Sequence, residues 1–208
     1  MTQIKTFFRD DRGGPAAEFA LVLPLALIFL FGLIDVGRYM WEHNEAEKAT
    51  QMGTRFAAVT DLVPKTLAST SFVSATTPQG GTVPSSAFGG TRCISGSCNT
   101  VPTNACPSGN GTAGIDWGYE PTAFTNIVNR IRKFKSNVAA TNVIIDYANA
   151  GLGYAGDPIG SDVAPLITVR LCQLTFRPIT TRIFNASVAM PDFSYSLTTE
   201  DGAGIVSN

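Results

Sequence analysis

The sequence contains one histidine, His43, and no excess of charge of either sign. Lysine and arginine total 15 against 16 aspartates and glutamates, so a basic surface for nucleic acid is not expected. Nucleophilic sites of the Ser–His or Cys–His type need an imidazole held beside the nucleophile. His43 lies shortly after a long apolar run, which is a poor position for a catalytic cleft. We therefore expect neither an enzyme nor a nucleic-acid partner.

The four cysteines lack the short C-x-x-C spacing of zinc sites and thioredoxin motifs, and no histidine lies near them. We therefore expect no metal and no cofactor. Two disulfides are the better interpretation, although four cysteines allow three pairings and the sequence does not choose among them. We favour Cys93 with Cys98, which closes a small loop, and Cys106 with Cys172, which ties a long loop to a strand. Free buried thiols are the alternative.

One long apolar run is present, near the N-terminus, where residues 19–34 carry no charge. With its flanks the run covers residues 14–37, roughly 36 Å at ~1.5 Å per residue. That length crosses a hydrocarbon core of ~30 Å. A buried core helix is disfavoured because no later segment is apolar enough to surround it. A cleaved secretory signal is disfavoured because no A-x-A pattern follows, so we expect a retained single membrane span at 14–37.

The basic residues around the span give a weak orientation signal, since three precede it within residues 1–13 and two follow it closely. The cysteines all lie after the span, which favours an oxidising compartment for the C-terminal part. Asp35 and Arg38, at the end of the run, are expected to mark the outer membrane interface rather than a functional site.

A helical period continues past the span and ends before Pro64, which predicts one long helix over residues 14–63. Its apolar stripe is Ala49, Met52, Phe56, Val59 and Val63, with Thr54 among the polar residues opposite. The mean hydropathy of +0.13 comes mainly from the first half of this helix.

The remaining residues, 64–208, predict a polar α+β domain. Residues 64–118 are rich in Thr, Ser, Gly and Pro and predict an irregular loop stapled by disulfides. A second amphipathic helix is predicted over 121–139, with Arg130, Lys133 and Lys135 on a solvated face. Strands are predicted at 142–147, at 166–176 with a bulge, and at 193–198, while residues 182–190 fit either type. The predicted fold is a long N-terminal helix packed on a small domain with an antiparallel sheet.

Glu18 stands five residues after Gly13, at the start of the apolar run. A carboxylate inside a membrane is costly and usually has a partner. If a peptidase cut after Gly13, Gly14 would become the amino terminus and Glu18 the fifth residue. The Glu18 carboxylate would then face the α-amine of a neighbouring subunit in an apolar bundle. The alternative is a side chain that extends to the lipid headgroups.

This segment resembles the TadE-like pseudopilins of tight-adherence (Flp-type) pili, which belong to the type IV pilin superfamily. The matching residues are Arg12-Gly13, Glu18-Phe19-Ala20, Leu23-Pro24-Leu25, Phe31-Gly32 and Asp35-Val36-Gly37-Arg38. The resemblance covers residues 12–59. Beyond residue 60 it is limited to a strand followed by Phe176-Arg177-Pro178.

The resemblance implies a minor pilin, a structural component of pilus assembly that a prepilin peptidase processes at the leader, residues 1–13. Pro15 departs from the family pattern and would slow cleavage or shift it to follow Gly14. The implied assembly residues are Glu18, Phe19 and Pro24. The implied location is the bacterial inner membrane, with a single span, a periplasmic C-terminal domain and possible incorporation into the extracellular pilus. Other pilins and the pilus assembly platform are the implied partners. A membrane-anchored adhesin or binding module is the alternative.

Overall fold

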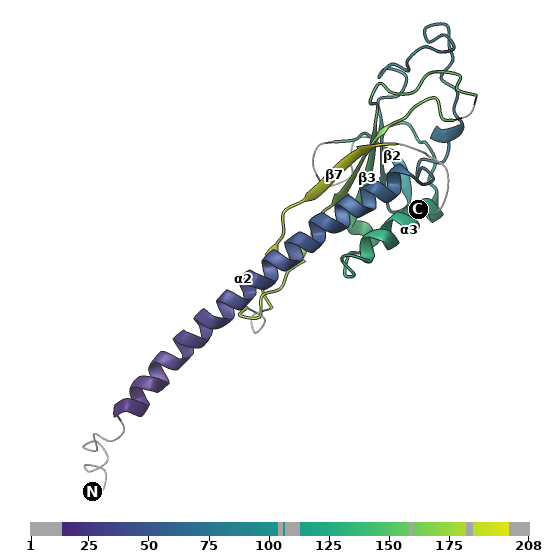
Figure 1. Ribbon diagram of the computed structural model, residues 1–208. Helices are drawn as coiled ribbons and strands as arrows, with labels where there is room; N and C mark the ends of the chain where they lie inside the picture. The colour runs from purple at the N-terminus through teal and green to yellow at the C-terminus, as the bar shows by residue number, and fades with distance from the viewer. Residues whose placement is uncertain (1–13, 104–105, 107–112, 159, 182–184, 200–208) are drawn as a thin grey trace, which may run out of the picture. The chain divides into compact units, whose positions relative to one another are not determined.

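The computed structural model describes residues 14–103, 106, 113–158, 160–181 and 185–199 of the 208. The chain divides into two compact units. The first comprises Met1–Trp41 and Phe176–Val188, and the second comprises Glu42–Thr175 and Ala189–Asn208. Helix α2, Gly14–Ala58, is continuous across the boundary between the units (Figure 1). Each unit is described below by itself.

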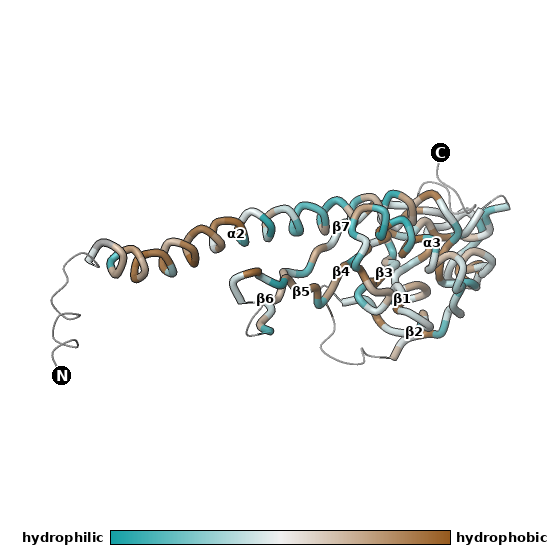
Figure 2. Tube along the Cα trace, turned by 90° about the horizontal axis from the view of Figure 1, so that it is seen from below, coloured by the Kyte–Doolittle hydropathy of each residue, from teal (hydrophilic) through white to brown (hydrophobic). Residues whose placement is uncertain are grey.

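In the first unit, the N-terminal part of α2 is apolar on all sides (Figure 2). The helix continues through Pro24 without interruption. Among the described residues, α2 is the one helix long and apolar enough to cross a membrane. The segment Phe176–Val188, which we call the returning segment, completes this unit.

The second unit is built on a five-stranded sheet in the order β2-β1-β3-β4-β7, with every neighbouring pair antiparallel. The strands are β1 (Thr91–Ile94), β2 (Ser97–Thr100), β3 (Val143–Ala148), β4 (Leu166–Leu171) and β7 (Phe193–Thr198). The predicted α+β class with an antiparallel sheet is confirmed. Strands β5 (Thr175–Phe176) and β6 (Val188–Ala189) form a separate two-stranded sheet.

One face of the large sheet packs against α3 (Pro121–Arg132) and the C-terminal part of α2. Ile145 pairs with Val169, which pairs with Tyr195, so the three side chains share that face. α3 begins with Pro121 in its first turn, and the Glu120 side chain accepts a hydrogen bond from the Thr122 N–H. The apolar side of α3 is buried, as its spacing predicts: Ala123, Phe124, Ile127, Val128 and Ile131.

The buried side of α2 differs in part from the predicted stripe. Ala49 is buried as predicted, and so is Val63 just beyond the helix, but the rest of the buried side consists of Ala, Gly and Thr. Thr54, which was expected to face solvent, is fully buried, whereas Met52 and Phe56 are only half-buried. The Thr54 hydroxyl donates hydrogen bonds to the Thr50 and Tyr195 carbonyl oxygens, which removes the cost of burying it. Small side chains allow the α2 backbone to approach the sheet. The helix also ends at Ala58, earlier than the predicted residue 63.

The predicted irregular loop at 64–118 contains regular structure. It holds β1 and β2 at one edge of the sheet and a short 3₁₀ turn, η2 (Leu67–Ser69). It also has an apolar cluster of its own, in which Phe72, Phe88 and Trp117 pack with ring centroids 5.4–6.2 Å apart. The prediction of an irregular loop was therefore wrong in these parts.

Three further features differ from the prediction. α3 ends at Arg132 rather than at residue 139, and a 3₁₀ turn, η3 (Ala140–Asn142), follows before β3. The predicted strand 166–176 is not one bulged strand, because Gln173 adopts a left-handed φ of 56° between β4 and β5. Lys135 is buried rather than solvated, with Nζ 3.3 Å from Glu42 Oε2 and 4.0 Å from Glu45 Oε2.

Candidate assembly segment and its anchor

Helix α2 begins at Gly14, directly after the predicted cleavage position. Gly13 itself lies outside the described residues. Glu18 lies in the second turn of the helix and is exposed. The ion pairs formed by the described residues do not include Glu18. Within the described part of the chain, this carboxylate therefore has no counter-charge.

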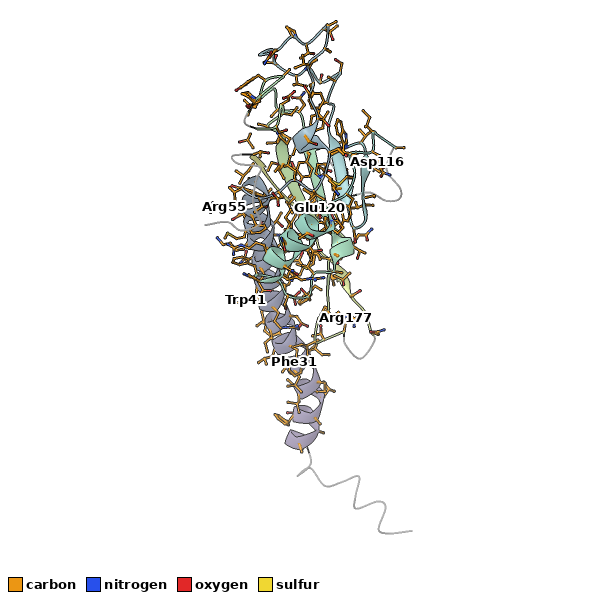
Figure 3. The ribbon with its side chains drawn as sticks, turned by 90° about the vertical axis from the view of Figure 1, so that its right-hand side faces the viewer. Phe31, Trp41, Arg55, Asp116, Glu120 and Arg177 are labelled. Atoms are coloured by element: carbon orange, nitrogen blue, oxygen red, sulfur yellow. A yellow bond between two sulfur atoms is a disulfide. The ribbon has the colours of Figure 1, made fainter. Side chains whose placement is uncertain are left out.

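Between residues 19 and 36 the helix exposes large apolar side chains in every direction, and Phe31 is labelled within this stretch in Figure 3. Phe19, at the start, is 65% exposed. Pro24 is also exposed and lies within the same helix. A contiguous apolar surface of this extent is unusual on a soluble monomer and requires lipid or other apolar helices to cover it.

Asp35 lies at the end of this apolar surface, and it is only 6% exposed. Its Oδ1 accepts a hydrogen bond from the Ile179 N–H at 2.7 Å. Its Oδ2 accepts hydrogen bonds from the Thr180 N–H at 2.9 Å and from the Thr180 hydroxyl at 2.8 Å. Three donors from the returning segment thus satisfy one helix carboxylate, and hydrogen bonds to a charged group are among the stronger ones in proteins. We call this arrangement the Asp35 anchor.

Arg38 extends the Asp35 anchor by one helical turn. Its Nη1 lies 3.3 Å from Asp35 Oδ1 and donates to the Arg177 carbonyl oxygen at 3.5 Å. Its guanidinium also lies over the Phe176 ring, 5.3 Å from the centroid. The Tyr39 ring meets Phe176 edge-on with centroids 5.5 Å apart. These contacts fix the start of the returning segment against α2.

Glu18 and Asp35 delimit the apolar stretch of the helix. They are 17 positions apart, which corresponds to about 26 Å at ~1.5 Å per residue. This is close to the ~30 Å thickness of a hydrocarbon core. One carboxylate is satisfied by the chain's own returning segment, and the other is presented without a partner among the described residues.

The family model described as TadE-like protein matches residues 13–55. Residues 13–55 are TadE-like. The TadE-like segment contains Glu18 and Asp35. No curated protein and no solved structure matches the chain. The rest of the chain, residues 56–208, lies outside the family match.

The four cysteines lie beyond the TadE-like segment and form two disulfides, Cys93–Cys98 and Cys106–Cys172. These are the pairs that the sequence analysis favours. Cys93 and Cys98 face each other across β1 and β2. Asp192 lies close to Cys106 and Cys172. Because both sulfur atoms are bonded to each other, they offer no thiolate to a metal ion.

The structure places the predicted assembly residues Glu18, Phe19 and Pro24 along one helix of the first unit, whereas the cysteines belong to the second unit. The sequence analysis missed the role of Asp35, because its partners, two backbone N–H groups and one threonine hydroxyl, lie far along the chain and carry no charge that would signal the contact. The adjacent Phe176-Arg177-Pro178 was a signal, since this was the one piece of the family resemblance beyond residue 60.

A buried charge cluster was also missed. Arg92 donates from Nε and Nη2 to the two carboxylate oxygens of Asp146 at 2.6 and 2.8 Å, and Arg170 Nε donates to Asp146 at 2.9 Å. The pairing of Arg92 with Asp146 across β1 and β3 explains the contact. This cluster joins three strands of the sheet and serves the fold.

Proposed function

We propose that the chain is a minor pilin of a tight-adherence pilus, with a structural and not an enzymatic role in assembly. A prepilin peptidase processes it after Gly13, and it then acts with other pilins and with the pilus assembly platform. The match of residues 13–55 to the TadE-like family supports this proposal. The long apolar α2, which is suited to a membrane, supports it independently.

The observation that carries the proposal is the contrast between the two carboxylates at the ends of the apolar stretch. Asp35 is buried and accepts three hydrogen bonds from the returning segment. Glu18 is exposed and forms no ion pair with any described residue. An ionisable group near the edge of a membrane without a partner among the described residues of its own chain is suited to a partner in another chain.

Removal of residues 1–13 would create such a partner. The new α-amine on Gly14 carries a positive charge at neutral pH and lies at the helix N-terminus, where the helix dipole adds to that charge. Glu18 lies one helical turn further along. When two subunits pack side by side in an apolar bundle, the Glu18 carboxylate of one reaches the α-amine of its neighbour. The pair sets the axial register, because any other register leaves both charges unpaired in a low dielectric.

The proposed location is the bacterial inner membrane, with residues 14–37 of α2 as a single span and with the second unit in the periplasm. The two disulfides in the second unit support this orientation, since disulfides persist in oxidising compartments. During assembly the α2 helices move from lipid into the pilus bundle, which covers the same apolar side chains.

The test is a Glu18→Gln variant in a host that makes tight-adherence pili. We expect the variant to be processed and inserted but to yield few or no pili, because the amide cannot neutralise the neighbouring amine. Glu18→Asp keeps the charge and should retain more assembly. Glu47→Gln, which removes the same charge from an exposed position on α2 in the second unit, is the matched control and should assemble normally. Normal pili with Glu18→Gln would favour a membrane-tethered adhesin instead.

A further inference from the structure

A hollow of about 530 Å³ lies in the first unit, beside the Asp35 anchor. Its lining residues are Arg38, Arg177, Pro178, Ile179, Asn185 and Ala186. Arg38 comes from α2, and the others come from the returning segment. The hollow is therefore held at a fixed height along α2 by the hydrogen bonds of Asp35 to the returning segment.

Along α2, the hollow lies where the apolar stretch ends. Val36, one residue beyond Asp35, is still an exposed apolar side chain, and Met40 and Trp41 follow within two turns. Trp41 is 69% exposed and is labelled with Arg177 in Figure 3. Exposed tryptophan at the end of a span is typical of the interface between hydrocarbon and headgroups. The hollow thus lies at the level of the lipid headgroups.

The lining of the hollow is cationic. The described residues that line it include two arginines and no acidic side chain. The carboxylate of Asp35, three residues before Arg38 on α2, is engaged by Arg38 and by the N–H groups of Ile179 and Thr180. Arg38 is held through Nη1, which leaves the guanidinium other N–H groups with which to meet an anion. Arg177 contributes its carbonyl oxygen to Arg38, while its side chain is exposed.

Hydrogen bonds within the returning segment hold the shape of the hollow. Ala186 donates its N–H to the Thr181 carbonyl oxygen at 3.4 Å, and the Thr181 hydroxyl donates to the Ala186 carbonyl oxygen at 3.3 Å. Asn185 adopts a left-handed φ of 52°, a conformation that asparagine tolerates better than most residues. Ile179, in the same lining, is 41% exposed and adds an apolar contact for an acyl chain or glycerol backbone.

We propose that this hollow binds the phosphate of an anionic phospholipid, in the leaflet on the side of the C-terminal unit. Arginine binds phosphate through two parallel N–H donors, and two arginines without a facing acid favour a lipid with net negative charge. The exposed Ile179 in the lining favours a lipid over free phosphate, and so does the exposed Trp41, three residues after Arg38 on α2. The inference rests on the membrane anchoring in the proposed function. Lipid binding here would hold the subunit at its correct depth before assembly.

The test uses the full-length chain in nanodiscs made from an equimolar mixture of phosphatidylcholine and phosphatidylglycerol. Native mass spectrometry measures which lipids stay bound when the disc is stripped away. We expect the wild type to retain phosphatidylglycerol in preference to phosphatidylcholine. Arg177→Gln should lower this enrichment about fivefold, the effect of one arginine at an anionic surface. Arg55→Gln, an equal loss of charge at an exposed α2 position in the second unit, should leave it unchanged.

Three results would overturn the inference. The first is equal retention of the two lipids by the wild type, and the second is an unchanged enrichment in Arg177→Gln with both disulfides intact. The third is loss of the enrichment on adding excess inorganic phosphate, because the hollow would then be a site for a soluble anion. Failure of the chain to insert into nanodiscs would contradict the membrane anchoring itself, which separates that failure from the failure of the lipid site.

Discussion

Thr180 donates two hydrogen bonds to one oxygen of Asp35, from its N–H at 2.9 Å and from its hydroxyl at 2.8 Å. The two residues are 145 positions apart, yet they belong to the same compact unit. This contact fixes the returning segment at the end of the apolar stretch of α2. It also distinguishes Asp35, which is satisfied within the chain, from Glu18, which we propose to be satisfied by a neighbouring subunit.

Asp35→Asn should loosen the returning segment. An amide offers one acceptor oxygen where the carboxylate offers two, and it loses the charge that strengthens the bonds from Ile179 and Thr180. Hydrogen bonds to charged groups contribute about 1.5–3 kcal/mol, so backbone exchange at Ile179 and Thr180 should become roughly 10- to 100-fold faster. Hydrogen exchange of the full chain in nanodiscs measures this. Thr180→Val, which removes only the hydroxyl, should give a smaller change, and unchanged exchange in Asp35→Asn would contradict the anchor.

Gly53→Ala should destabilise the second unit. A Cβ at this position would lie 2.6 Å from Ile131 Cγ1 and 3.0 Å from its Cδ1. Overpacking of this kind costs about 1–3 kcal/mol. Gly37→Ala is the control on the same helix, because a Cβ there meets nothing within 4 Å. Thermal unfolding in detergent should show a lower midpoint for Gly53→Ala only, and a second substitution, Ile131→Val, should recover part of it. A midpoint unchanged by Gly53→Ala would contradict the close packing of α2 and α3.

The two disulfides should contribute unequally to stability. Cys106–Cys172 spans 66 positions, and Cys93–Cys98 spans five. The loop-closure relation gives about 4 kcal/mol for the longer loop and about 2 kcal/mol for the shorter one. Denaturant unfolding of the two double-alanine variants measures the difference. Equal losses, or a larger loss for the short loop, would show that chain entropy is not the main contribution.

Asp162 should make the second unit sensitive to acid. Burial raises the pKa of Asp162, but the N–H groups of Gly156, Phe72 and Asp157 outweigh burial and hold the pKa below the usual aspartate value. A lowered pKa stabilises the fold above the unfolded value of about 3.9 and loses that effect as pH falls through the folded value. The stability gap between wild type and Asp162→Asn should therefore be largest at neutral pH and shrink below about pH 4. A gap that stays constant with pH would contradict this.

Features that depend on local sequence were predictable. The apolar run and the spacing of Gly13 and Glu18 predicted the helix and the family, and alternation along residues 193–198 predicted β7 with the bounds Phe193–Thr198. The predicted strand 142–147 differs from β3, Val143–Ala148, by one residue at each end. Each of these elements is encoded by its own residues, through a long apolar run, a short apolar run or a regular alternation, so no knowledge of a partner is needed.

Features that depend on partners far along the chain were not predictable. Lys135 follows the periodic part of α3 and read as a solvated cation, but Glu42 and Glu45 of α2 pair with it in the buried interior. Strands β1 and β2 are short and rich in Thr, Ser and Cys, so their pattern resembled loop until β3 provided a neighbour. The buried side of α2 was misjudged because close helix packing selects small residues such as Gly53 rather than large apolar ones.

The proposed pairing of Glu18 with a neighbouring α-amine depends on cleavage after Gly13. Mass spectrometry of the N-terminal peptide, on protein isolated from its own membrane, tests this cleavage most directly. The account predicts a chain that begins at Gly14, with Glu18 as its fifth residue, when the prepilin peptidase is present. Deleting the peptidase should leave residues 1–13 in place. A chain that keeps residues 1–13 in cells with an active peptidase would contradict the account, because no α-amine would then be available to pair with Glu18.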